Sequence, residues 1–179
     1  MPESKDKNEM LGRNWYAVHV RSNQEQKTNT FIKDREVEVF LPTYRVASKR
    51  RDRRVWLEKP LFPGYLFVQI DFRSPERVEV LKAPGTVRLV TFGDQPQTVP
   101  LETIESLKIL VGGARDEVRP HPLVRVGQRV QVVDGAFAGA VGILHETDER
   151  RPRLVVEVTF LGRAVAVPVS RYQVQPVIT

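Results

Sequence analysis

A change of residue pattern near Gly112 constrains the fold of this chain more than any other sequence feature. Before it, strand-like and helix-like stretches are mixed. After it come only short, β-branched stretches about ten residues apart, separated by glycine-rich or charged turns. Strands this short bury an adequate core only when their sheet closes on itself. The pattern predicts an all-β, small five-stranded barrel over residues 124–179, joined by a linker over residues 112–123 to a first domain.

The first domain, predicted over residues 14–111, has the pattern of an α+β domain in which helices flank an antiparallel sheet. The stretch WYAVHV (residues 15–20) alternates as a strand does. A helix is expected to follow at once, because Ser22 and Glu25 have the spacing of a capping box. Residues 1–13 are mostly polar, and we expect them to be disordered.

The segment EKPLFPGYLFVQID (residues 58–71) places a Pro-Gly pair before an alternating strand. Successive side chains of a strand point to opposite faces. The aliphatic side chains of this strand then share one face, which we expect to form the core: Leu66, Val68 and Ile70. Tyr65 and Phe67 lie on the other face, which ends in polar residues and should meet water. The alternative is that both rings pack under a loop, the basic hairpin or the second domain.

The charge of the chain favours an acidic or polyanionic partner without identifying one. The formal net charge is +6 and the pI is about 9.8. The cations concentrate in one run, broken only by an aspartate: Lys49, Arg50, Arg51, Arg53 and Arg54. This run is either a solvated hairpin tip or a nucleic-acid contact, and the sequence favours neither over the other.

Several classes of function find no support in the sequence. The chain has no cysteine, its three histidines are far apart, and its glycine-rich stretch GAFAGAVG lacks the Lys-Ser/Thr of a phosphate-binding loop. We therefore expect no enzyme, no metal site and no cofactor. Without a long apolar stretch or a secretory signal pattern, the expected location is the cytoplasm, away from membranes.

Three segments in order resemble the NusG family of transcription elongation factors: NWYAVHVRSNQEQK, PLFPGYLFVQID and VGQRVQVVDGAFAGAVGILHE. The resemblance covers about residues 14–177 and implies an NGN-like first domain, a KOW barrel and binding to RNA polymerase. Within the family, three segments are similar in sequence to those of specialised antiterminators of the UpxY and RfaH type: EVFLPTYR, KPLFPGYLFVQID and PHPLVRVGQRVQV.

The resemblance assigns a polymerase contact to the outer face of the first domain. Family members pack this face onto the clamp helices, a coiled coil of the largest polymerase subunits. The matching positions here are Ala17, His19, Phe62, Tyr65 and Phe67. Aromatic residues suit such a contact because each buries a large area at little entropic cost.

The resemblance also implies contact with the non-template DNA strand at the upstream edge of the transcription bubble. The matching residues open the first helix, and the basic run adds further candidates: Arg21, Gln24, Lys27, Lys49, Arg50 and Arg51. Ordinary helix polarity explains the first three equally well. Where RfaH-like proteins carry a basic residue before the glycine of APGTV, this chain has Pro84, so the same base readout is not expected.

In the barrel, Phe137 occupies the tip of the glycine-rich loop. The resemblance implies that it anchors a small-subunit ribosomal protein or the termination factor Rho. The alternative is a loop aromatic that folds back as a plug. The β-branched runs RLVVEV and AVAVPV predict a barrel with no autoinhibitory helical form.

The leading functional hypothesis is a monomeric factor that binds polymerase and upstream DNA, raises processivity and suppresses pausing at particular operons. The first alternative is a housekeeping NusG that recruits Rho or the ribosome. A second alternative, a ribosome- or RNA-binding protein with a KOW barrel, leaves the first domain unexplained.

Overall fold

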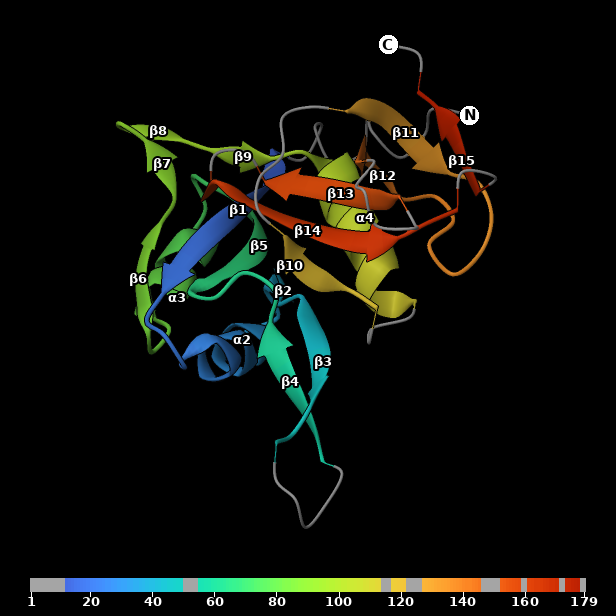
Figure 1. Ribbon diagram of the computed structural model, residues 1–179. Coiled ribbons are helices and arrows are strands. Elements are labelled where there is room, and N and C mark those ends of the chain that lie inside the picture. The colour runs from blue at the N-terminus through green and yellow to red at the C-terminus, as the bar shows by residue number, and fades with distance from the viewer. Residues whose placement is uncertain are drawn as a thin grey trace. The chain divides into compact units, whose positions relative to one another are not determined.

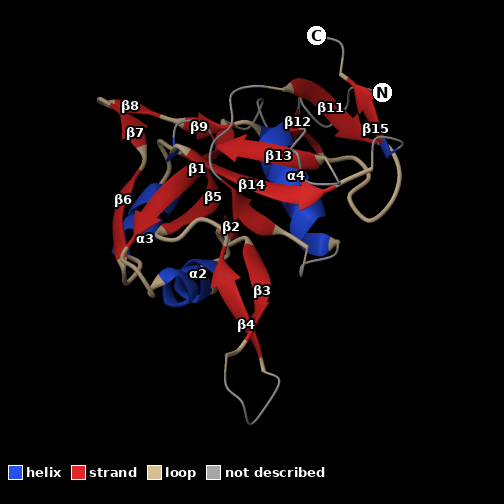
Figure 2. Cartoon of the chain, in the orientation of Figure 1, coloured by secondary structure: helices blue, strands red, loops and turns tan. Residues whose placement is uncertain are grey.

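The computed structural model describes residues 12–49, 55–113, 117–121, 127–145, 152–158, 161–170 and 173–177. The chain divides into two compact units, one formed by Met1–Leu41 and Phe62–Leu101, the other by Pro42–Leu61 and Glu102–Thr179. The first unit combines helices with an antiparallel sheet, and the second is built mainly of strands (Figures 1 and 2). The predicted fold class is thereby confirmed.

The sheet of the first unit has the strand order β2-β5-β1-β6, and β9 also pairs with β1. Its elements are β1 (Arg13–Val20), α2 (Glu25–Lys33), β2 (Glu38–Phe40), β5 (Tyr65–Asp71), α3 (Glu76–Lys82), β6 (Thr86–Leu89) and β9 (Thr98–Val99). A small hairpin, β7 (Thr91–Phe92) with β8 (Gln95–Pro96), follows β6. The central pair β1–β5 runs in continuous register from Arg13 opposite Asp71 to His19 opposite Tyr65.

One face of this sheet carries the core of the unit. Alternate residues of β1 and β5 point into it, and one residue each from α2 and α3, Ile32 and Val80, belongs to the same buried cluster. The strand residues of this cluster include Tyr16, Val18, Val20, Leu66, Val68 and Ile70. The alternation in the sequence therefore predicted the core face correctly, because side-chain parity in a strand is fixed by the pleat.

The first helix begins later than its capping pattern predicted. It spans Glu25–Lys33, and its N-cap is Gln24, whose side chain makes no capping hydrogen bond. The predicted capping box was wrong, because the Glu25 carboxylate accepts a hydrogen bond from the Gly64 N–H instead. Asn23 and Glu36, just outside the two ends, have positive φ and turn the chain away from the helix axis.

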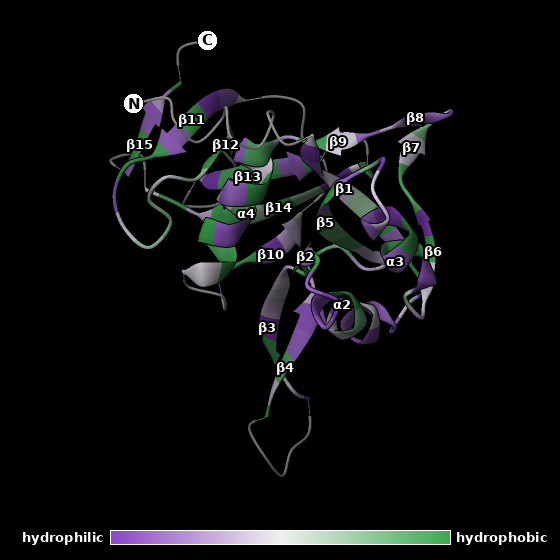
Figure 3. Cartoon of the chain, turned by 180° about the vertical axis from the view of Figure 1, so that it is seen from behind, coloured by the Kyte–Doolittle hydropathy of each residue, from purple (hydrophilic) through white to green (hydrophobic). Residues whose placement is uncertain are grey.

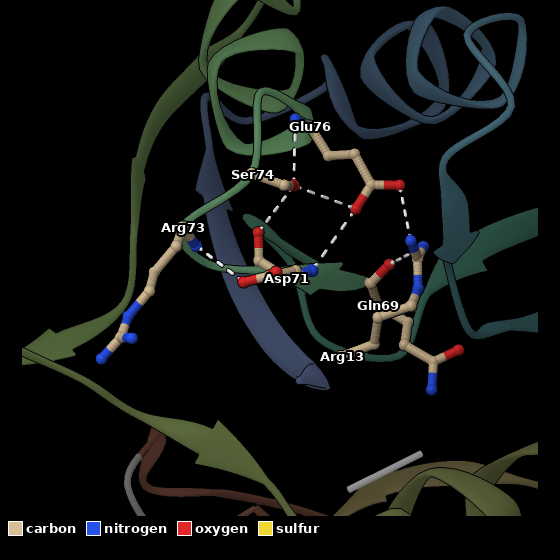
Figure 4. A network of polar contacts seen from close by, with 6 residues as sticks. All are labelled: Arg13, Gln69, Asp71, Arg73, Ser74 and Glu76. Carbon is tan, nitrogen blue, oxygen red and sulfur yellow. Dashed lines mark hydrogen bonds and ion pairs between the residues drawn. The ribbon is translucent and has the colours of Figure 1, made fainter. Parts of the chain in front are cut away.

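A polar network closes one end of the β1–β5 pair and fixes the start of α3 (Figure 4). The Arg13 guanidinium donates to the Glu76 carboxylate at 2.7 Å and to the Gln69 carbonyl oxygen at 2.9 Å. The other carboxylate oxygen of Glu76 accepts from the Asp71 N–H and the Ser74 hydroxyl. Ser74 Oγ accepts the Glu76 N–H at 3.2 Å. Glu76 thus joins β1, β5 and α3.

The second unit contains a six-stranded antiparallel sheet in the order β10-β14-β13-β12-β11-β15. Its strands are β10 (Arg119–His121), β11 (Gln128–Val132), β12 (Val141–His145), β13 (Arg153–Val158), β14 (Arg163–Pro168) and β15 (Val174–Pro176). The five predicted strands are present. The sixth, β10, lies in the segment predicted as linker and pairs with β14, so part of that segment is strand.

The second unit also contains the hairpin β3 (Thr43–Ala47) with β4 (Trp56–Pro60) and the helix α4 (Leu101–Gly112). The Ser106 hydroxyl, buried on α4, accepts the Val141 N–H of β12 at 2.9 Å, and Arg129 of β11 forms an ion pair with Glu102. Figure 3 shows hydrophobic and hydrophilic residues alternating along this helix. The domain boundary predicted from the sequence placed the α4 segment in the first domain, whereas the contacts of α4 group it with the strands of the second unit.

We predict that Glu76→Ala lowers the free energy of unfolding by about 1 to 2 kcal/mol, because it leaves the Asp71 N–H and the Arg13 guanidinium without their shared acceptor. Urea unfolding followed by circular dichroism measures the change. Glu79→Ala on the same helix is the control, since Glu79 makes only exposed ion pairs, to Lys82 and Arg35. Equal effects of the two substitutions would contradict the role assigned to Glu76.

We also predict that Gly142→Ala destabilises the barrel by about 2 kcal/mol or more, because a Cβ there would lie 2.4 Å from the Val155 carbonyl oxygen on the adjacent strand. Gly112→Ala at the end of α4 is the matched control, since its Cβ would meet nothing within 4 Å. Thermal unfolding of both variants tests this, and a Gly142→Ala protein as stable as the Gly112→Ala protein would refute it.

Candidate functional site

The second face of the first sheet brings together four of the residues predicted to bind a partner. Ala17 pairs with Phe67 across β1 and β5, and His19 pairs with Tyr65 one step further along. Directly opposed residues of an antiparallel pair lie on the same face, so these two pairs are adjacent. Strand parity predicted the common face of Tyr65 and Phe67, and the resemblance added Ala17 and His19 to it.

Aromatic contacts organise this face. The His19 and Tyr65 rings stack with their centroids 5.2 Å apart and their planes at 29°. The Phe62 ring meets the Phe67 ring edge-on, at 5.6 Å and 85°, and the Phe40 ring of β2 lies 6.3 Å from the Phe67 ring. These separations and angles are those that the ring quadrupoles favour.

The expectation that Tyr65 and Phe67 both meet water was wrong for Phe67. Ala17, Phe62 and Phe67 are fully buried, while His19 and Tyr65 are partly exposed. Phe67 lies on β5, which has a neighbouring strand on each side, so its ring is flanked by Phe40 on one side and by Ala17 on the other. The polar residues at the end of β5 misled the sequence argument, because they describe only that end of the strand.

The turn before β5 explains how Phe62 and Tyr65 are placed. The Tyr65 N–H donates to the Phe62 carbonyl oxygen at 2.9 Å, and Gly64 has φ +82°. Proline in the second position and a positive φ in the third are the marks of a type II turn. The Gly64 carbonyl oxygen accepts the Val20 N–H at 2.8 Å, which joins the turn to the end of β1.

The predicted DNA-contact residues lie around the start of α2. Arg21 and Lys27 are exposed, and Gln24 is half-buried. The Arg21 N–H donates to the Gly85 carbonyl oxygen, and a Cβ on Gly85 would lie 2.6 Å from Gln24 Cβ, so the loop before β6 packs directly on this helix end. Arg21 follows directly after β1, and both Arg21 and Lys27 are exposed to solvent.

The hairpin β3–β4 carries the predicted basic run. Lys49 is exposed, whereas Arg50 and Arg51 lie outside the described residues. Sequence reasoning did not single out Trp56, which is 59% exposed on β4 opposite Ala47. The Arg119 guanidinium lies 5.7 Å from the Tyr44 ring and joins the hairpin to β10.

Phe137 differs from its predicted environment. It lies in the loop between β11 and β12, as expected, but is only 6% exposed. A Cβ on Gly113, just after α4, would lie 3.0 Å from the Phe137 ring, so the backbone at the end of α4 passes directly over it. The alternative in which this aromatic folds back describes the structure better than an exposed loop tip.

No group of three or more potential metal ligands is present among the described residues. Within the same ranges, no helix is long and apolar enough to cross a membrane.

Comparison with known proteins identifies the family. The model of the family described as "Transcription termination factor nusG" matches residues 13–108. The protein named Transcription termination/antitermination protein NusG of Thermus thermophilus is 32% identical, over 89% of this chain and 96% of its own length. The Escherichia coli K12 protein of the same name is 29% identical, over 90% and 94%.

A solved structure agrees with the sequence comparison. The Thermotoga maritima NusG structure titled "Domain interaction in Thermotoga maritima NusG" matches with a TM-score of 0.54 and 25% identity, over 93% of this chain and 98% of that one. The family model covers more than half of the chain, and the relatives match along nearly all of it. This chain belongs to the NusG family.

Proposed function

We propose that this protein is a transcription elongation and antitermination factor that binds RNA polymerase at the clamp helices of its largest subunit. The observation that carries the proposal is the His19–Tyr65 stack, a partly exposed aromatic pair at the end of the central strand pair. Membership of the NusG family supports it, since relatives that match nearly full length are named for termination and antitermination.

The buried members of the face have a supporting role in this proposal. Tyr65 and His19 make the first contact with the polymerase, and Phe62, Phe67 and Ala17 form the rigid apolar surface behind them. A ring that is already stacked loses little freedom when a partner covers it. Aromatic residues in such settings are frequent hot spots of protein interfaces.

The start of α2 is the proposed contact for the non-template DNA strand. Arg21 and Lys27 offer exposed cations and Gln24 an amide, groups that contact phosphates and unstacked bases. The hairpin that carries Lys49, Arg50 and Arg51 is proposed to add a further, sequence-independent attraction. No covalent chemistry is needed, because holding polymerase and upstream DNA together opposes clamp opening and pausing. The factor would act as a cytoplasmic monomer, at particular operons.

A second function is favoured by the near full-length match to NusG proteins of several bacteria. In it, the protein is a housekeeping factor whose barrel recruits Rho or the ribosome through the surface around Phe137. That surface would first have to be uncovered, because Phe137 is buried in the described structure.

We predict that Tyr65→Ala weakens binding to core polymerase by about tenfold or more, as expected for an interface hot spot. Biolayer interferometry with immobilised polymerase measures the dissociation constant. Phe92→Ala is the control, since Phe92, in the β7–β8 hairpin, is a large apolar residue of the same unit that is 82% exposed. Unchanged binding by the Tyr65 variant would remove the His19–Tyr65 pair from the interface.

Rho-dependent termination assays with purified components separate the two functions. The antitermination proposal predicts longer transcripts and shorter pauses when this protein is added, with no rise in termination at Rho sites. Enhanced termination would support the housekeeping function and contradict the proposed one. Adding the Tyr65→Ala protein controls for effects that do not require polymerase binding, since it should leave transcript lengths as they are without any factor.

A further inference from the structure

Glu25 is a buried carboxylate that core packing does not explain. It is 5% exposed, although it lies in the first turn of a helix whose neighbouring residues, Gln26 and Lys27, face solvent. A buried carboxylate is unfavourable unless hydrogen bonds or charges compensate it. Here its Oε1 accepts the Gly64 N–H at 2.9 Å, and the helix N-terminus adds a favourable electrostatic contribution.

The bonded N–H is the one that distinguishes the two common turn types. Type I and type II turns share their ends and differ in the orientation of the central peptide, which in residues 62–65 joins Pro63 to Gly64. The Gly64 N–H belongs to that peptide. An acceptor placed on it therefore stabilises one of two orientations, and Glu25 is that acceptor.

Both ends of this turn carry the aromatic residues of the proposed polymerase contact. Tyr65 closes the turn and stacks on His19, while Phe62 opens it and packs on Phe67. A flip of the central peptide would change the backbone angles of Pro63 and Gly64, which lie between Phe62 and Tyr65. Because the two turn types share their ends, Glu25 acts on Tyr65 mainly by holding the whole turn on the start of α2 through the Gly64 N–H.

The same helix end holds a second loop. The Thr28 hydroxyl lies 2.6 Å from the Pro84 carbonyl oxygen, and the Arg21 N–H bonds to the Gly85 carbonyl oxygen. The first turn of α2 therefore joins the proposed DNA-contact residues to both neighbouring loops. Glu25 is the residue that connects this helix end to the turn at residues 62–65.

We infer that Glu25 is a positioning residue, which fixes the Pro63–Gly64 peptide and thereby holds the His19–Tyr65 pair in its binding geometry and in register with the start of α2. This inference rests on the proposed polymerase contact. It assigns to Glu25 no direct contact with polymerase or DNA.

The test compares Glu25→Ala, Glu25→Gln and Thr28→Val in the full chain. Glutamine keeps an amide oxygen that can accept the Gly64 N–H, whereas alanine keeps no acceptor. Thr28→Val removes a buried hydrogen bond from the same helix end without touching the turn at residues 62–65, so it controls for a general loss of stability.

We expect Glu25→Ala to raise the dissociation constant for core polymerase about tenfold, and Glu25→Gln and Thr28→Val to stay within about threefold of the unsubstituted protein. Rescue by glutamine separates positioning by a hydrogen bond from a requirement for the charge. A Glu25→Ala protein that binds as well as the Thr28→Val protein would overturn the inference.

A second readout does not depend on polymerase. The Gly64 amide, followed by nuclear magnetic resonance, should exchange with solvent about tenfold faster in Glu25→Ala than in Thr28→Val. If the unsubstituted protein fails to bind polymerase, the proposed function fails, and this amide still decides whether Glu25 fixes the turn. Equal exchange in the two variants would show that it does not.

Discussion

The antiparallel pairing of β1 with β5 is the interaction on which the rest of the first unit depends. Its register sets the two faces of the sheet at once, so that Tyr16 and Val68 point to the core and Ala17 and Phe67 to the other side. A slip of one residue would exchange the two faces completely. The interactions that fix this register are therefore as important to the proposed polymerase contact as the residues proposed to make it.

Each end of this pair is held by one buried or half-buried glutamate. Glu76 joins the Arg13–Asp71 end to the start of α3, and Glu25 joins the His19–Tyr65 end to the start of α2. Both carboxylates accept a backbone N–H of a turn or strand end, and both belong to the first turn of their helix. The polar groups thus pin the helices to the strand ends, while the aliphatic core supplies most of the driving force.

Much of this arrangement follows from local sequence. The alternation of side chains along a strand predicted both faces of β1 and β5, because it depends only on the pleat. The Pro63-Gly64 pair marked the turn before β5. The helix α4, Leu101–Gly112, begins directly after Pro100 and ends at a glycine, since proline and glycine delimit helices through their own backbone preferences. The short strands of the barrel were equally readable from their β-branched runs.

What the sequence did not reveal depends on contacts between distant residues. Phe67 packs beside Phe40, which the pairing of β2 with β5 brings from 27 positions away. Glu25 matched a local capping pattern with Ser22, yet its partner is Gly64, 39 positions on. The covering of Phe137 requires the backbone at Gly113, and β10 becomes a strand only because β14 offers it a partner.

These long-range contacts change the physical account of the proposed contact surface. An exposed cluster of flexible aromatics would gain area on binding but would lose rotamer freedom with it. In this chain the inner rings are already packed and the outer pair is already stacked, so most of that ordering is complete before a partner arrives. Affinity then depends on how accurately the outer pair is placed. For this reason a single hydrogen bond to the turn that precedes Tyr65 can matter as much as a ring in the interface.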